Sequence, residues 1–123
     1  MGKIDINFTL DFILKSIDLI EKRFSDINSG EDFLKNDENL EKFDSISMRL
    51  QAIGENIKNL YKNNPEILES IASRDYWSSI IKMREIISHH YINIDAGIVY
   101  DICKNELVEL KEKIIEIKKR DRS

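Results

Sequence analysis

Residues 38–62, ENLEKFDSISMRLQAIGENIKNLYK, contain the pattern that decides the fold. Apolar side chains recur there at alternating three- and four-residue steps, which places them along one side of an α-helix. Gly54 interrupts this helix at a cost of about 1 kcal/mol relative to alanine. We therefore expect a second backbone to approach the helix closely at Gly54. The apolar positions, spaced as in helices that pack antiparallel in a bundle, are Phe43, Ile46, Leu50, Ile53, Ile57 and Leu60.

The rest of the chain repeats this helical periodicity on both sides. One proline and four glycines in 123 residues are too few for the many turns of an all-β fold. The sequence therefore predicts an all-α fold, an antiparallel up-and-down bundle of four to five helices, as a single domain over residues 1–123. The other expected elements are a helix from a cap at Asp5 to about Phe24, a helical turn from Pro65 to about Ile71, a helix beginning near Asp75, and a last helix capped by Asp95 with Val99, Cys103, Leu107, Leu110, Ile114 and Ile117 on its apolar face.

Charge and cysteine content narrow the classes of function. The net charge of −4 argues against a protein that binds nucleic acid through its overall charge, although a local basic site remains compatible with it. Cys103 is the only cysteine, so a disulfide within the chain is excluded and a reducing compartment fits. No signal peptide and no stretch of roughly 20 apolar residues is evident. We expect a cytoplasmic protein in which Cys103 is a small buried apolar side chain.

Arg84 stands on the apolar face of the helix that begins near Asp75. Trp77, Ile80 and Ile87 recur at helical spacing, and position 84 belongs to the same stripe. Because a guanidinium stays charged, it needs a partner, water, an interface or a site. One interpretation is that Glu55 is the buried partner of Arg84. The alternative is that Glu55, like its neighbours Arg49 and Gln51, is a solvated group beside the apolar seam.

Both histidines of the chain, His89 and His90, follow Arg84 closely, and Tyr91 comes next. A histidine can take a proton from a ribose 2′-hydroxyl, and an arginine can stabilise the charge on the adjacent phosphate. The pair is thus suited to RNA cleavage without a metal or other cofactor. A zinc site is disfavoured, because neighbouring side chains point about 100° apart on a helix and no acidic ligand stands at a zinc-binding spacing.

The spacing of Arg84 and His89 leaves two interpretations open. Five residues correspond to about 140° around a helix, so the two side chains converge only if the helix ends near His89 or a second subunit completes the site. Alternatively, Arg84 forms a buried ion pair, and His89 and His90 interact with the C-terminal end of the helix.

A longer pattern surrounds these residues. It reads Trp77-x2-Ile80-x2-Met83-Arg84-x4-His89-x-Tyr91-x3-Asp95-x2-Ile98-Val99-Tyr100-Asp101, with Met48-Arg49-Leu50-x2-Ile53-Gly54-Glu55 before it and Lys104-Asn105-x-Leu107-x2-Leu110-Lys111 after it. This set resembles the HepT branch of the HEPN superfamily over nearly the whole chain, from about residue 8 to 117.

The resemblance implies a HEPN-like helical endoribonuclease that is the toxin of a type VII toxin–antitoxin system. It implies Arg84 and His89 as the catalytic pair, in a cleft at a homodimer interface. The implied partner is a minimal nucleotidyltransferase (MNT-type) antitoxin, which silences the toxin by attaching AMP to Tyr91. Glu85 departs from the family pattern, in which this position is often Asn, Asp or His, and its charge could repel a phosphate. His90 has only the looser Arg-x5-His spacing and is, with Glu85, a secondary candidate for the site.

Two functions from other classes remain open. One is a helical module without catalysis of its own that binds nucleotide or substrate for a minimal nucleotidyltransferase, an interpretation favoured by Glu85 and the acidic composition. The other is a purely structural dimerisation domain, which would tolerate Arg84→Leu.

Overall fold

The computed structural model of the protein describes residues 6–89 and 95–121, with only the backbone of Ile86, Ser88 and His89. Every regular element in these two ranges is helical, which confirms the predicted all-α class. The elements are α1 (Ile6–Phe24), the short η1 (Glu31–Leu34), α2 (Asp37–Asn63), α3 (Pro65–Glu69), α4 (Arg74–His89), α5 (Ala96–Asp101), the π-helical turn η3 (Ile102–Glu106) and α6 (Leu107–Asp121).

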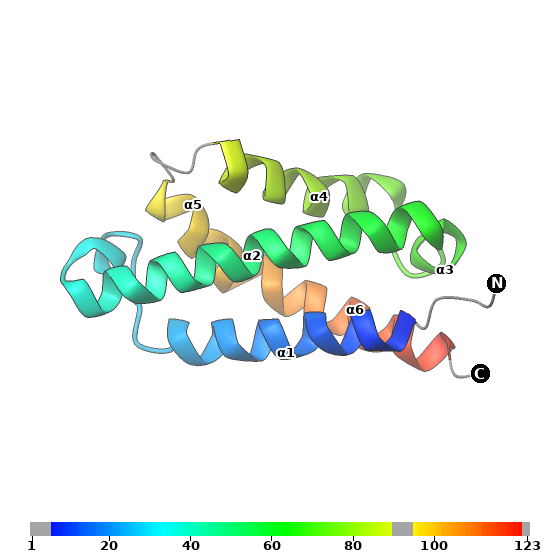
Figure 1. Ribbon diagram of the computed structural model, residues 1–123, viewed down its shortest axis with the longest axis horizontal. Coiled ribbons are helices and arrows are strands. Elements are labelled where there is room, and N and C mark those ends of the chain that lie inside the picture. Colours follow the sequence, from blue (N-terminus) through cyan, green and yellow to red (C-terminus); the bar gives the residue numbers. More distant parts are fainter. Residues whose placement is uncertain (1–5, 90–94, 122–123) are drawn as a thin grey trace.

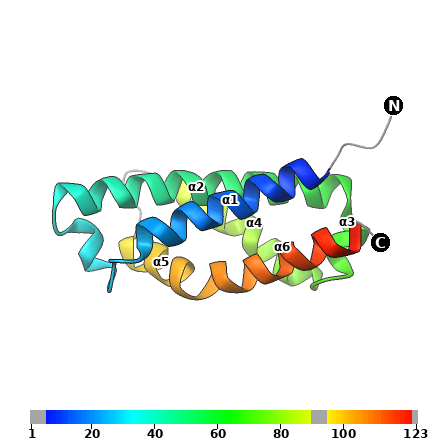
Figure 2. The same cartoon turned by 90° about the horizontal axis from the view of Figure 1, so that it is seen from below.

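The long helices alternate in direction and form an up-and-down bundle (Figure 1). α2 lies between α1 and α4 and packs most extensively against α4. α5, η3 and α6 follow one another along the opposite side of the bundle (Figure 2). The start of α1 and the end of α6 lie at the same end as α3, where the Asn7 amide donates to the Asp121 carboxylate at 3.2 Å. No helix in the described ranges has both the length and the apolar character needed to span a membrane.

The core is built from the apolar stripes that the sequence predicts. All six apolar positions expected in residues 38–62 are buried, and so are all six expected in the last helix. Trp77 of α4 is fully buried and its indole N–H donates to the Leu68 carbonyl at 2.8 Å, which ties α4 to α3. Burial of these stripes is the main stabilising contribution to the fold, at about 25 cal/mol per Å² of apolar surface.

Helix ends follow the expected capping chemistry. The Asp95 carboxylate accepts from the Gly97 N–H at 2.8 Å and starts α5, and the Ser73 hydroxyl accepts from the Tyr76 N–H at 3.1 Å at the start of α4. Pro65 is the first residue of α3, as predicted, although this helix ends at Glu69, before the expected Ile71. The predicted cap Asp5 lies outside the described residues.

The last helix is not uniform, and in this respect the prediction was wrong. A π-helical turn, η3, separates α5 from α6. Val99, Cys103 and Leu107 stand four residues apart twice in succession, which exceeds two turns of 3.6 residues. A wider turn takes up the excess, so that all three side chains remain buried.

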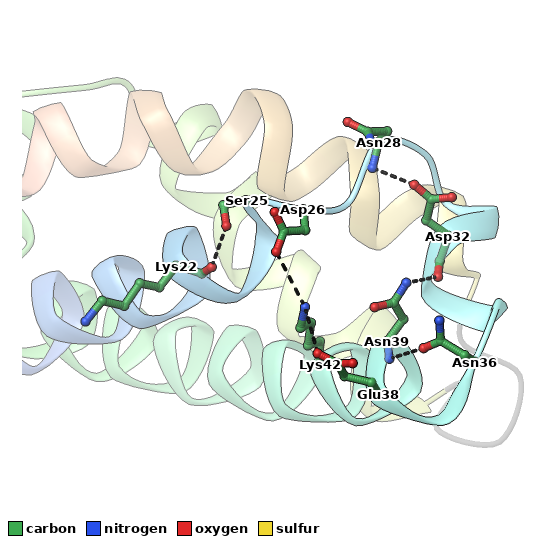
Figure 3. Close-up of polar contacts among 9 residues, drawn as sticks. All are labelled: Lys22, Ser25, Asp26, Asn28, Asp32, Asn36, Glu38, Asn39 and Lys42. Atoms are coloured by element: carbon green, nitrogen blue, oxygen red, sulfur yellow. Dashed lines mark hydrogen bonds and ion pairs between the residues drawn. The ribbon is translucent and has the colours of Figure 1, made fainter.

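The connection between α1 and α2 is held by polar contacts around η1 (Figure 3). The Asp32 carboxylate accepts from the Asn28 N–H at 2.8 Å, and the Asn39 amide donates to the Asp32 carbonyl at 2.8 Å. The Asn36 side chain caps α2 by accepting from the Asn39 N–H. Phe33 of η1 is fully buried against the bundle. These contacts set where α2 begins and hence how it lies beside α1.

Candidate active site

Arg84 faces α2 at the place where Gly54 leaves room for it. A Cβ atom built on Gly54 lies 2.4 Å from the Arg84 Cβ and 3.3 Å from the Arg84 Cα. Real Cβ atoms do not approach this closely, so the two helices touch here only because position 54 has no side chain. The close approach expected at Gly54 is confirmed, and the second backbone is that of α4 at Arg84.

Glu55 is the partner of Arg84. The Arg84 Nε lies 3.0 Å from the Glu55 Oε2, with the two side chains 22% and 49% exposed. The Nε–H is not aligned with this oxygen, and within the described ranges it has no acceptor at hydrogen-bond geometry. The contact is therefore a close ion pair by distance rather than a well-aligned hydrogen bond. Glu55 is half exposed, so the expectation of a pairing is confirmed while the expectation that it is buried is not.

An ion pair of this exposure contributes little stability, about 0–1 kcal/mol. Its consequence is geometric. The backbone of α4 packs directly against Gly54, and the guanidinium of Arg84 lies beside Glu55 of α2. Arg84 thereby presents a partly exposed positive group at the edge of the α2–α4 contact.

The other predicted site residues are placed only in part. His89 is the last residue of α4 and its side chain is not among the described atoms. His90 and Tyr91 lie outside the described residues. Glu85 follows Arg84 on α4 and is exposed. The described part of α4 extends to His89, and whether the side chains of Arg84 and His89 converge stays a prediction.

The remaining reactive groups in the described part of the chain do not offer a competing site. Burial raises the pKa of the Cys103 thiol to about 12, so it is protonated at neutral pH and a poor nucleophile, as the sequence predicts. In residues 6–89 and 95–121, no three His, Cys, Asp or Glu side chains stand together in a way that could hold a metal ion.

Two further arginines, Arg23 and Arg49, line a groove between α1 and α2. Arg49 was expected to be a solvated group beside the seam of α2. Arg23 has no sequence signal that distinguishes it from its neighbour Lys22, because both stand in a polar stretch near the end of a helix. Only the packing of α1 on α2 brings the two arginines together.

Comparisons with known proteins agree with the helical fold. The family described as "Ribonuclease HepT-like" matches residues 13–117. A "Gamma-glutamylcyclotransferase and putative RNase" of Methanocaldococcus jannaschii is 33% identical over 115 residues, 92% of this chain and 47% of that protein. The chain thus spans about half the length of this relative.

Two shorter relatives match along nearly their whole length. A "Putative RNase" of the same organism is 30% identical over 126 residues, covering 98% of this chain and 97% of the relative. A "Putative RNase" of Caldanaerobacter subterraneus is 28% identical over 118 residues, covering 92% and 94%. No solved structure matches the chain significantly.

Proposed function

Because the chain belongs to the HepT-like ribonuclease family, we propose that it is a metal-independent endoribonuclease with Arg84 and His89 as its catalytic pair. The observation that carries the proposal is the placement of Arg84. Arg84 stands on an apolar stripe, packs against Gly54 and forms an ion pair with Glu55. A leucine at this position would contribute more to stability. Such an arrangement is expected where the charge serves function.

The proposed reaction uses the ribose of the substrate as its own nucleophile. His89 takes the proton of the 2′-hydroxyl, and the 2′-oxygen attacks the adjacent phosphorus. The bond from phosphorus to the 5′-oxygen breaks, and that oxygen receives a proton from the imidazolium or from water. Arg84 stabilises the additional negative charge that the phosphoryl oxygens carry in the transition state. The products are a 2′,3′-cyclic phosphate and a 5′-hydroxyl end.

We further propose that the active form is a homodimer. Arg84 and His89 are about 140° apart on a straight helix, so a second protomer that closes over the end of α4 is the simplest way to bring both groups to one phosphate. A dimer also supplies two copies of Arg84 around one cleft, which concentrates positive charge where RNA binds although each chain carries a net charge of −4.

RNA cleavage in EDTA tests the proposed activity. We expect a fluorescent single-stranded RNA to be cut with the chelator present and to leave a cyclic phosphate that mass spectrometry identifies. The matched control is the same oligonucleotide with 2′-deoxy residues, which lacks the nucleophile and should stay intact. Cleavage of the deoxy control, or cleavage that depends on added metal, contradicts the mechanism.

Within this proposal, Tyr91 is the point of regulation by an MNT-type nucleotidyltransferase antitoxin in the cytoplasm. An attached AMP brings bulk and negative charge to a residue two positions from His89, where both oppose the entry of a phosphate. On co-expression with a neighbouring nucleotidyltransferase, we expect the intact mass to rise by whole AMP units and RNA cleavage to be lost. Tyr91→Phe is the control; a mass increase that persists in this variant refutes the assignment.

One observation favours the non-catalytic alternative. Glu85 is exposed next to Arg84 and adds negative charge beside the proposed phosphate site. If the purified native protein binds ATP or GTP and leaves RNA intact, a nucleotide-binding partner of a nucleotidyltransferase replaces the ribonuclease as the best account.

A further inference from the structure

A groove of about 310 Å³ runs between α1 and α2, away from the α2–α4 contact. α1 contributes Arg23. α2 contributes four residues at i, i+3, i+4 and i+7 spacing, which therefore share one side of the helix; these are Ser45, Met48, Arg49 and Ala52. The groove is at the lower end of the size range of small-molecule pockets. It has an apolar wall, a hydroxyl and two guanidinium groups.

The two arginines of the groove lack a negative partner. The Arg49 Nη1 donates to the hydroxyl of the fully buried Ser16 over 3.4 Å, a long contact with a neutral group. The Arg23 Nη1 is buried, and no acceptor for it exists in the described part of the chain. No carboxylate in residues 6–89 or 95–121 forms an ion pair with either. The lysines that do pair with carboxylates in these ranges are Lys42, Lys111, Lys113 and Lys118.

This arrangement costs stability. A buried donor without an acceptor is unfavourable, and two positively charged side chains that line one groove repel each other. The repulsion between the two side chains persists, because arginine stays charged in proteins. An oxyanion in the groove offsets the repulsion between the two charged side chains that line it, and it offers an acceptor near the unsatisfied Arg23 donor.

We propose that this groove binds a backbone phosphate of RNA at a subsite separate from Arg84. The inference rests on the proposed ribonuclease function, because RNA is the anion that such an enzyme must hold. A phosphate offers two free oxygens to two guanidinium forks, and the neighbouring apolar wall, with Met48 68% exposed, suits a ribose or a base. A protein partner needs about 800 Å² of surface on each side, more than a groove of five residues supplies.

The subsite lies on a different side of α2 from the proposed catalytic group. Arg49 and Gly54 are five residues apart, about 140° around the helix and about 7.5 Å along its axis. An RNA strand bound both at this subsite and at Arg84 crosses the surface of α2, which is about 10 Å wide. The subsite therefore positions the strand, whereas Arg84 contacts the phosphate that reacts. An acidic chain thereby obtains a local basic contact where its overall charge offers none.

Binding of an uncleavable RNA tests the inference without depending on catalysis. The probe is a fluorescent 2′-O-methyl oligoribonucleotide, whose 2′-oxygen has no proton to lose, and anisotropy is measured at several salt concentrations. For Arg23→Gln and for Arg49→Gln we expect affinity to fall about tenfold. We also expect the slope of log K against log salt to decrease by about 0.7 for each phosphate that the variant no longer neutralises. Lys22→Gln is the matched control, because it removes the same charge from the adjacent exposed position, which does not line the groove.

A second variant guards against a loss of folding in the arginine substitutions. Met48→Glu adds a carboxylate at an exposed position of the groove, so the fold is unaffected and RNA binding should weaken as well. Equal affinity of the native protein, Met48→Glu and the arginine variants overturns the subsite. So does a weaker affinity that light scattering traces to a changed oligomeric state, which makes the groove a protein interface. If the native protein binds RNA and loses this binding in the variants but never cleaves it, the subsite stands and the proposed catalysis fails.

Discussion

His89→Ala is expected to lower the rate of RNA cleavage by about 10²–10⁴-fold, the usual contribution of a general base. His89 is the last described residue of α4 and is not part of its apolar stripe, so the substitution leaves the core stripe of α4 intact. The rate of cleavage under single-turnover conditions measures the loss. Binding of the 2′-O-methyl oligoribonucleotide should change little, because the imidazole acts on a proton that this probe does not have.

His90→Ala is the control for this substitution. It makes the same chemical change one position further along the chain, and only His89 has the His-x-Tyr spacing of the family. We expect His90→Ala to retain most of the activity. An equal loss in both variants shifts the catalytic role to the pair or to His90, and full activity of His89→Ala removes the assignment altogether.

Gly54→Ala is expected to lower the free energy of unfolding by about 1–3 kcal/mol, as overpacking in a close-packed contact does. At most helical positions the same substitution stabilises by about 1 kcal/mol. Here the new Cβ meets the Arg84 Cβ at 2.4 Å, and both atoms are attached to the backbone rather than to the end of a flexible chain. α2 and α4 must therefore move apart. The shift displaces Arg84 from Glu55, so RNA cleavage should fall together with stability; the urea midpoint and the cleavage rate measure the two effects.

A double substitution separates the contact from any general effect of alanine at position 54. Arg84→Gly removes the atom that the new Cβ meets, so Gly54→Ala with Arg84→Gly should be less destabilised than the sum of the single changes. Lys58→Ala, an exposed change on α2, is the matched surface control and should stay within about 0.5 kcal/mol of the native protein. Gly54→Ala with native or higher stability contradicts the close helix contact.

The helices and the core could be predicted from the sequence to a large extent. Periodicity predicts the apolar stripes of α2 and of the C-terminal helices, because burial on one side of a helix imposes a spacing that a sequence displays directly. The cap at Asp95 and the proline at the start of α3 can likewise be predicted, because each depends only on neighbouring residues in the sequence. The π-helical turn was missed, since the two four-residue steps across it look like ordinary helical spacing unless the phase of the whole helix is followed.

The candidate site could be predicted only in part from the sequence. Arg84 was conspicuous because a charge on an apolar stripe violates the pattern, and Gly54 was conspicuous because it weakens a helix. That the two residues are each other's neighbours is a contact between separate helices, and only the packing of α2 on α4 reveals it. The sequence leaves the pairing of Arg84 with Glu55 as one of two interpretations. The distance of 3.0 Å between the Arg84 Nε and the Glu55 Oε2 decides for the ion pair.

Spacing along the chain is sufficient to predict a helical bundle and the residues that fill its core, and the pattern of Arg84, His89 and Tyr91 resembles that of the HepT-like family. These are properties of spacing and side-chain chemistry along one helix. The packing of the helices is needed to show that Arg84 rests on Gly54, that Glu55 pairs with it while half exposed, and that Arg23 and Arg49 line one groove. Such relations depend on the rotation and separation of two packed helices, which the whole core sets together and no single helix encodes.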